Sequence, residues 1–238
     1  MSTQIDVGGI PVEVVFKNIK NVHLSVHPPT GRVRISAPER MNLDTLRVYA
    51  ISKLDWIKKQ QSRLQAQERE TKRDYSDRES HFVWGRRYLL KVNEANQAPT
   101  VELLHNQMAL TVRPGAGTGK REAVVAAWYR DEIRLALSPL IEKWEPVLGV
   151  KANRVIVRRM KTKWGSCNPH TGNIHLNTEL AKKPRECLEY VLVHELVHLL
   201  EPTHNDRFVS LMDKFLPQWK HLRDELNRAP LGHVEWEY

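Results

Sequence analysis

Hydrophobic and polar positions alternate in several short stretches at the start of the chain. Residues 11–17, 22–26 and 32–37 show the alternation that is typical of half-buried strands. Apolar residues then recur every three or four positions from Asn42 to about Lys72, which predicts a long helix with Asn42 as its N-cap. We therefore expect a small sheet followed by a long helix.

Strand-like patterns return farther along the chain. Residues 81–92 and 101–112 predict a second group of strands. A further helix is expected from Arg121 to about Trp144, with a bend at Pro139 because proline removes a helical hydrogen bond. No internal repeat is detected in the sequence. Together these elements indicate the α+β class.

Residues 186–201 form a strongly apolar segment without glycine or proline. Pro184 suits the start of a helix, and Pro202 would stop it. The apolar side chains run almost all the way round this helix, as expected of a helix that is buried inside a domain.

The polar residues of this segment include His194, Glu195 and His198, which stand in an apolar setting. The two histidines are four positions apart, so their imidazoles lie about one turn apart on the same helix face and can reach one metal ion. Glu195 is rotated by ~100° from His194, which suits a general base beside the metal. The pattern predicts a zinc site, and the alternative is a buried helix with structural histidines and no metal.

A catalytic zinc ion usually takes three ligands from the protein, so one ligand must come from outside this helix. We predict His204, which follows the Pro202 stop, and expect Thr203 to cap a second helix. Glu201 is the competing ligand, although its position favours a supporting role. More distant alternatives are Asp213, Asp224 and Glu225.

Three segments, in this order and spacing, resemble the YgjP-like (SprT-like) zinc metallopeptidases: Arg-Met-Lys-Thr-Lys-Trp-Gly-Ser-Cys at 159–167, Asn-Ile-His-Leu-Asn at 173–177, and the His-Glu-x-x-His motif with His204. The resemblance extends from about residue 22 to the C-terminal helices. It implies His194, His198 and His204 as zinc ligands and Glu195 as catalytic base of a peptide-bond hydrolase. The residues next to His204 differ from those common in related sequences.

The resemblance completes the predicted domain organisation. Residues 79–238 are expected to form a zincin-like metallopeptidase domain, with an active-site helix and a mixed or antiparallel sheet. Residues 1–78 would hold the N-terminal strands and the long helix that precede it.

Two short stretches, residues 155–157 and 173–177, predict paired strands joined by a turn-rich connection. Peptide substrates often bind proteases as an added strand along an exposed sheet edge. We assign this edge to four residues, Asn173, Ile174, His175 and Leu176; a hairpin that serves only packing is the alternative. His170 or His175 could also stabilise the oxyanion, although lone histidines near a surface more often face solvent.

The composition indicates a soluble globular protein: 41% of its 238 residues are hydrophobic and 27% are charged. No stretch approaches ~18 uninterrupted apolar residues, and the start lacks the features of a secretory signal, so we expect a cytoplasmic protein without membrane contact. Two cysteines make no disulfide framework, and we expect Cys167 to be a small packing residue.

The formal net charge of +9 adds a further hypothesis, since basic surfaces attract nucleic acid. SprT-like relatives include proteases that act on proteins attached to DNA, so a DNA-associated protease is an alternative function. Acidic residues interleaved with the basic ones favour a solvated surface instead. A non-catalytic zinc-binding interaction protein is the third class, and Glu195 argues against it because structural zinc needs no base.

Overall fold

The computed structural model describes residues 2–27, 30–66, 73–160 and 163–228. The chain divides near residue 70 into two compact units, each of which is described by itself below. The predicted domain boundary between residues 78 and 79 stays a prediction.

The N-terminal unit contains a four-stranded sheet. Its strands are β1 (Ser2–Val7), β2 (Ile10–Lys17), β3 (His23–His27) and β4 (Arg32–Pro38), in the order β1-β2-β4-β3. The inner pair β2–β4 is parallel, and both outer pairs are antiparallel. The three predicted strands are confirmed, and the sequence interpretation missed β1.

Two helices, α1 (Leu43–Ser52) and α2 (Leu54–Ala66), follow this sheet. Asn42 caps α1 by accepting a hydrogen bond of 2.8 Å from the Thr45 backbone N–H, as predicted. The prediction of one long helix is wrong because the chain turns at Lys53. After the turn, Ile57 is fully buried in the core of this unit. The predicted continuation over residues 67–72 lies outside the described residues.

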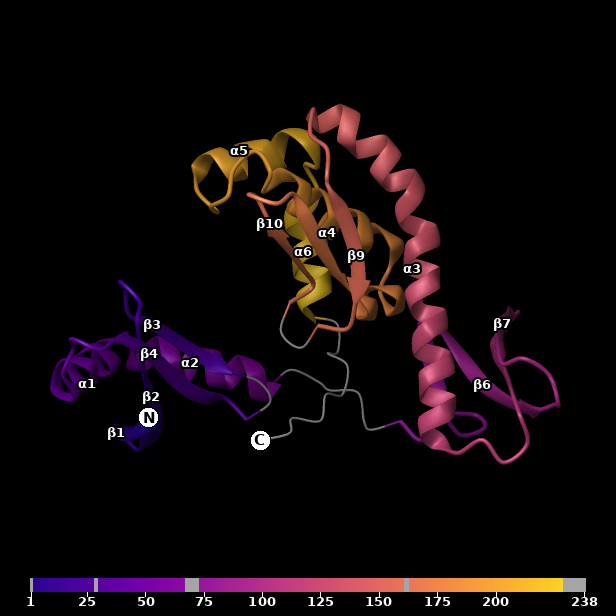
Figure 1. Cartoon of the computed structure of the whole chain (residues 1–238), viewed down its shortest axis with the longest axis horizontal. Coiled ribbons are helices and arrows are strands. Elements are labelled where there is room, and N and C mark those ends of the chain that lie inside the picture. The colour runs from indigo at the N-terminus through magenta and orange to yellow at the C-terminus, as the bar shows by residue number, and fades with distance from the viewer. Residues whose placement is uncertain (1, 28–29, 67–72, 161–162, 229–238) are drawn as a thin grey trace. The chain divides into compact units, whose positions relative to one another are not determined.

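The C-terminal unit begins with a second four-stranded sheet. Its strands are β5 (Ser80–Val83), β6 (Arg86–Glu94), β7 (Thr100–Leu104) and β8 (Gln107–Val112), in the order β5-β6-β8-β7. These strands confirm both predicted strand regions. Helix α3 (Thr118–Leu148) is longer than predicted and continues through Pro139. Figure 1 shows this long helix reaching from the sheet that holds β6 and β7 to the sheet that holds β9.

The two four-stranded sheets have the same strand order and the same strand directions. In the second sheet the inner pair β6–β8 is again parallel, and the outer pairs are antiparallel. The first turn of each sheet also matches, since Gly8 and Gly9 have φ of 61° and 82° and Trp84 and Gly85 have φ of 49° and 79°. The fold therefore contains a structural repeat that was not detected in the sequence.

A three-stranded mixed sheet and three helices complete the C-terminal unit. The strands are β9 (Arg154–Arg158), β10 (Gly165–Asn168) and β11 (Asn173–Asn177), in the order β10-β11-β9. A 3₁₀ helix, η1 (Thr178–Lys182), leads to α4 (Arg185–Val197), and α5 (Asp206–Phe215) and α6 (Trp219–Arg228) follow.

Helix α4 lies at the centre of this part and contacts β10, β11, α3, α5 and α6 (Figure 1). Its side chains at Leu188, Leu192, Val193 and Leu196 are fully buried, as the apolar pattern predicts. The helix ends at Val197 rather than at residue 201. The α+β class, with the motif helix beside a mixed sheet, is confirmed. Among the described residues, no helix combines the length and apolar character that crossing a membrane requires.

Candidate metal centre

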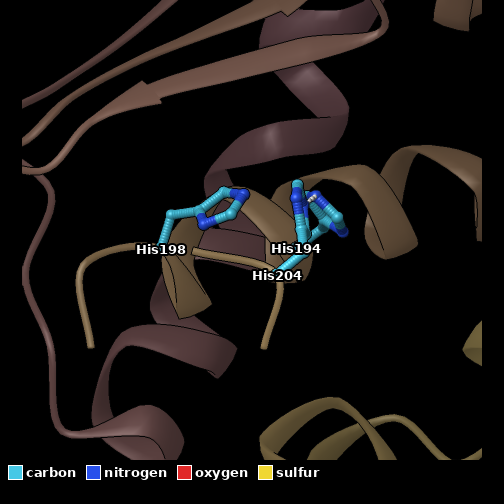
Figure 2. A group of neighbouring side chains, drawn as sticks. All are labelled: His194, His198 and His204. Atoms are coloured by element: carbon cyan, nitrogen blue, oxygen red, sulfur yellow. Dashed lines mark hydrogen bonds between the residues drawn. The ribbon is translucent and has the colours of Figure 1, made fainter. Parts of the chain in front are cut away.

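Three histidines come together where α4 ends. His194 lies in the last turn of α4, His198 follows the helix directly, and His204 lies in the connection to α5. Their candidate ligand atoms all lie within 4.8 Å of one another, and the Nε2 atoms of His194 and His204 are 3.0 Å apart. Figure 2 shows the three rings gathered around one point. Three imidazoles converging on one point form a donor set that suits zinc.

The backbone after α4 explains how His204 returns to the helix. His198 keeps helical dihedrals (φ −64°, ψ −17°), so its relation to His194 is that of two residues one turn apart. Asn205 then caps α5 by accepting a hydrogen bond of 3.0 Å from the Phe208 N–H. The prediction that Thr203 is the cap is therefore wrong. The cap fixes Phe208 against all three imidazoles, with ring centroids 4.7 to 4.9 Å apart.

A backbone carbonyl orients His198. Its Nδ1 lies 3.1 Å from the carbonyl oxygen of Glu201. A carbonyl only accepts, so Nδ1 carries the proton and Nε2 keeps the lone pair that a metal needs. The Glu201 carboxylate instead accepts a hydrogen bond of 2.9 Å from the Thr203 hydroxyl. Among the described residues, the group that could hold a metal ion contains three histidines and none of the competing acids.

Burial keeps the histidines of the helix neutral. The pKa of His194 is lowered to about 3, first by burial and then by repulsion from His198 and His204. Burial also lowers the pKa of His198. Neutral imidazole is the form that binds metal, so the protonation states fit the donor geometry. No described residue pairs with the buried Nδ1 of His194.

Glu195 lies on the neighbouring face of α4 and is only 5% exposed. Burial raises its pKa to about 7, while the charge of Lys163 and a hydrogen bond from the Cys167 backbone N–H act in the opposite direction. Strand β10 passes so close that a Cβ at Gly165 would lie 2.6 Å from Glu195 Oε1. The absence of a side chain at Gly165 therefore leaves the space that the carboxylate occupies.

A cavity of about 380 Å³ opens beside these groups. Its walls come from β10 and the residues around it, from α4, from the connection to α5 and from α6. The three histidines, Glu195 and Tyr190 line it, together with Gly165, Ser166 and Cys167 of β10. The cavity places an ionisable carboxylate and the histidine cluster where a small part of a substrate can reach both.

The predicted substrate edge is wrong in its placement. Strand β11, with Asn173, Ile174, His175 and Leu176, is the central strand of its sheet and pairs with β10 and β9. Ile174 and Leu176 are fully buried. Both backbone edges of β11 are already used, so it cannot accept an added strand. The outer strand beside the cavity is β10.

The other residues considered around the site have different surroundings. His170 is exposed, His175 is half-buried, and neither lines the cavity. Cys167 does line the cavity, but burial and the nearby Glu195 raise the pKa of its thiol to about 11. Its backbone N–H donates a hydrogen bond to Glu195.

Asn177 has a structural role that the sequence interpretation missed. Its buried side-chain amide donates hydrogen bonds of 2.9 Å to the carbonyls of Met160 and Lys163, and its Oδ1 accepts from the Met160 and Glu179 backbone N–H groups. These bonds tie the two ends of the segment around residues 160–163 to β11. The only signal in the sequence was an asparagine at the end of a predicted strand.

A family model described as "YgjP-like, metallopeptidase domain" matches residues 20–229. The chain belongs to this family. The predicted YgjP-like resemblance is thus confirmed, and the family indicates a metal-dependent peptidase. No curated protein shows significant similarity to the chain.

Two solved structures resemble a part of this YgjP-like chain. The metallopeptidase zymogen abylysin of Pyrococcus abyssi is 27% identical, covers 37% of this chain and 89% of its own, and has a TM-score of 0.35. The metallopeptidase zymogen jannalysin of Methanocaldococcus jannaschii is 18% identical, with 38% and 87% coverage and the same TM-score. Family membership rests on the domain match and not on these partial similarities.

Proposed function

We propose that this protein is a zinc-dependent metallopeptidase that cleaves peptide bonds in protein or peptide substrates. The observation that carries the proposal is the convergence of His194, His198 and His204 beside the buried Glu195 in one cavity. The three imidazoles would hold Zn²⁺, and Glu195 would be the catalytic base. A structural zinc site without catalytic activity would need a fourth protein ligand and no base.

The zinc ion, Glu195 and the Cys167 backbone would have separate roles in the reaction. When bound, Zn²⁺ supplies the Lewis acidity that lowers the pKa of water and polarises a substrate carbonyl. Glu195 accepts a proton from the attacking water and delivers it to the leaving amine. In the metal-free protein, burial raises the pKa of this carboxyl to about 7, which leaves both of its protonation states accessible near neutral pH. The Cys167 N–H holds the carboxylate in place.

Strand β10 is the better candidate for binding the substrate backbone. Among the described strands it pairs with β11 alone, and three of its residues line the cavity. An extended peptide that hydrogen-bonds to the free edge of β10 would pass directly beside Glu195. This replaces the earlier assignment to residues 173–176, and it follows from the strand order rather than from the sequence pattern.

The proposal does not include nucleic acid as a partner. Two of the basic residues have acidic neighbours: Arg159 pairs with Glu122 at 3.6 Å, and Arg73 pairs with Glu79 at 3.4 Å. The DNA-associated alternative stays a prediction, and DNA binding that falls steeply with salt, together with DNA-stimulated proteolysis, would support it.

The experiment that tests the proposal combines metal analysis with cleavage of a peptide library. Glu195→Gln should retain zinc and lose cleavage by about 10²- to 10⁴-fold, because it removes the base without changing the shape. Glu186→Gln is the matched control, since it lies on the exposed face of the same helix. A zinc-loaded Glu195→Gln protein that cleaves at the wild-type rate would disprove the role of Glu195.

A second variant tests His204 as the third zinc ligand. His204→Ala should bind zinc at least about 100-fold more weakly than the wild type, whereas the exposed His221→Ala should bind it equally well. Unchanged zinc affinity after His204→Ala would remove this residue from the proposed site.

A further inference from the structure

The cavity beside the histidine cluster has an apolar wall that the proposed chemistry does not use. Tyr190, Val191 and Leu226 line it, and each is at most 6% exposed. Tyr190 and Val191 belong to α4, one turn before the histidine motif, and Leu226 belongs to α6. This wall offers a dry surface to the methylene groups of a substrate side chain.

Two cations line the same cavity, Lys163 and Arg223, and they act on different groups. The charge of Lys163 acts on Glu195 and His198, so this lysine lies toward the proposed catalytic base. The charge of Arg223 acts on the phenol of Tyr190. The guanidinium of Arg223 therefore lies toward the apolar wall. Among the described residues that line the cavity, Glu195 is the one acidic residue.

The guanidinium is held by the helix that carries it. It lies 5.1 Å from the ring centroid of Trp219, and the Trp219 indole N–H donates a hydrogen bond of 2.8 Å to Asp213. Its acidic neighbour is Asp224, at 3.2 Å, and the two side chains are 46% and 50% exposed. An exposed pair of this kind is weak and leaves further N–H donors of the guanidinium available.

We propose that Arg223 determines substrate specificity by binding the carboxylate of an acidic side chain next to the bond that is cleaved. Glutamate fits better than aspartate, because its two methylene groups can lie along the wall of Tyr190 and Leu226 while its carboxylate reaches the guanidinium. This inference rests on the proposed peptidase function. It deepens that function by naming the class of substrate.

The test compares peptides that differ only in Glu or Gln beside the scissile bond. The full-length, zinc-loaded protein should cleave the Glu peptide with a kcat/KM about fivefold higher. Arg223→Ala should abolish this preference, and Arg223→Glu should reverse it in favour of a Lys peptide. Asp224→Asn should increase the preference for Glu, because the guanidinium then has no competing carboxylate.

Arg134→Ala is the matched control. Arg134 is an exposed helical arginine that pairs with Asp131 at a distance of 3.0 Å, and it does not line the cavity. It should keep the full preference for Glu. Zinc content should be the same in all of these variants, which separates a change in specificity from a change in the metal centre.

Failure of this inference differs from failure of the proposed function. Cleavage of both peptides with equal kcat/KM, or a preference that survives Arg223→Ala, would overturn the role of Arg223 and leave the peptidase intact. Absence of all cleavage by the zinc-loaded protein would count against the peptidase. In that case the affinities of the Glu and Gln peptides for the protein still test the role of Arg223. Equal affinities would overturn its role in binding the substrate carboxylate.

Discussion

The two four-stranded sheets of this protein share one topology but support different kinds of core. Among the described residues of the N-terminal unit, every buried side chain of the core is apolar. In the C-terminal unit the buried side chains include Asn177, Lys183, Glu195 and His198. Buried polar groups cost free energy unless they are paired. Among the described residues, the buried polar side chains therefore all lie in the C-terminal unit, which also holds the candidate metal centre.

The first turn of each sheet shows how this difference is supported. The backbone N–H groups of Trp84 and Gly85 donate hydrogen bonds of 2.7 and 3.3 Å to the carbonyls of Ala181 and Lys182, just before α4 begins. A Cβ at Gly85 would lie 3.1 Å from Pro184, the N-cap of α4. A Cβ at the corresponding Gly9 would meet no described atom within 4 Å. The second glycine of the turn therefore packs against the start of the motif helix in one sheet, and its counterpart Gly9 has open space beside it in the other.

The largest expected effect concerns Glu195, the buried carboxylate of the C-terminal unit. Burial raises the pKa of Glu195 from 4.5 to about 7, so the folded state holds its proton more tightly than the unfolded state. In the metal-free protein this stabilisation is complete below about pH 4.5 and is lost as the pH rises through about 7. The loss amounts to about 3 kcal/mol.

Denaturant unfolding of the metal-free protein between pH 4 and pH 8 measures this effect. The difference in unfolding free energy between the wild type and Glu195→Gln should change by about 3 kcal/mol across this window, whereas the opposite pH dependence that the lowered pKa values of His194 and His198 cause is common to both proteins. Glu186→Gln should behave like the wild type. A difference between the wild type and Glu195→Gln that is the same at pH 5 and pH 8 would contradict the prediction.

The next largest effect compares the first turns of the two four-stranded sheets. Gly85→Ala and Gly9→Ala both place an alanine at positive φ, which costs about 1 kcal/mol in each. Gly85→Ala also presses on Pro184, so we expect a total loss of about 2 to 3 kcal/mol there. Thermal unfolding and peptidase activity of both variants test this. Equal losses would show that the contact with Pro184 has no energetic role.

A smaller effect follows from making the two turns alike. Trp84→Gly turns the second turn into a copy of Gly8-Gly9 and relieves the positive φ of 49°. It also removes the indole hydrogen bond to Glu132 (3.2 Å) and the packing of Arg185 over the ring (4.8 Å). We expect a net loss of about 1 to 2 kcal/mol in the unfolding of the C-terminal unit. A variant as stable as the wild type would mean that the tryptophan contacts only offset its backbone strain.

The smallest effect lies in the N-terminal unit and has the opposite dependence on pH. Hydrogen bonds from Arg34 and Arg32 lower the pKa of Glu13, so its stabilisation is present above about pH 4.5 and is lost as the pH falls. Glu13→Gln should destabilise this unit by less than about 1 kcal/mol at pH 7. Hydrogen exchange of the β2 amides at pH 7 and at low pH measures the change. If Glu13→Gln destabilises the unit equally at pH 7 and at low pH, the loss comes from packing and not from the hydrogen bonds with Arg34 and Arg32.

Much of the metal centre was predictable because it depends on local geometry. The spacing of His194 and His198 places two imidazoles on one helix face, and Pro202 predicts the turn that brings His204 back. The structure brings all three together. Element boundaries were less predictable: Lys53 interrupts the predicted long helix, and Asn205 rather than Thr203 caps α5. Capping depends on which of several neighbouring polar side chains can reach the free N–H groups, and Thr203 instead bonds to Glu201.

The sequence by itself determined the family, the α+β class, the histidine motif and the helix that carries it, since these depend on residue identity and spacing along the chain. Only the tertiary structure decided that β11 is central and β10 is the edge beside the cavity. It alone also revealed that Gly165 makes room for Glu195 and that Arg223 reaches the same cavity from α6. These facts depend on strand order and on contacts between segments far apart in the chain, and periodicity within one segment contains no information about which partner lies on its other side.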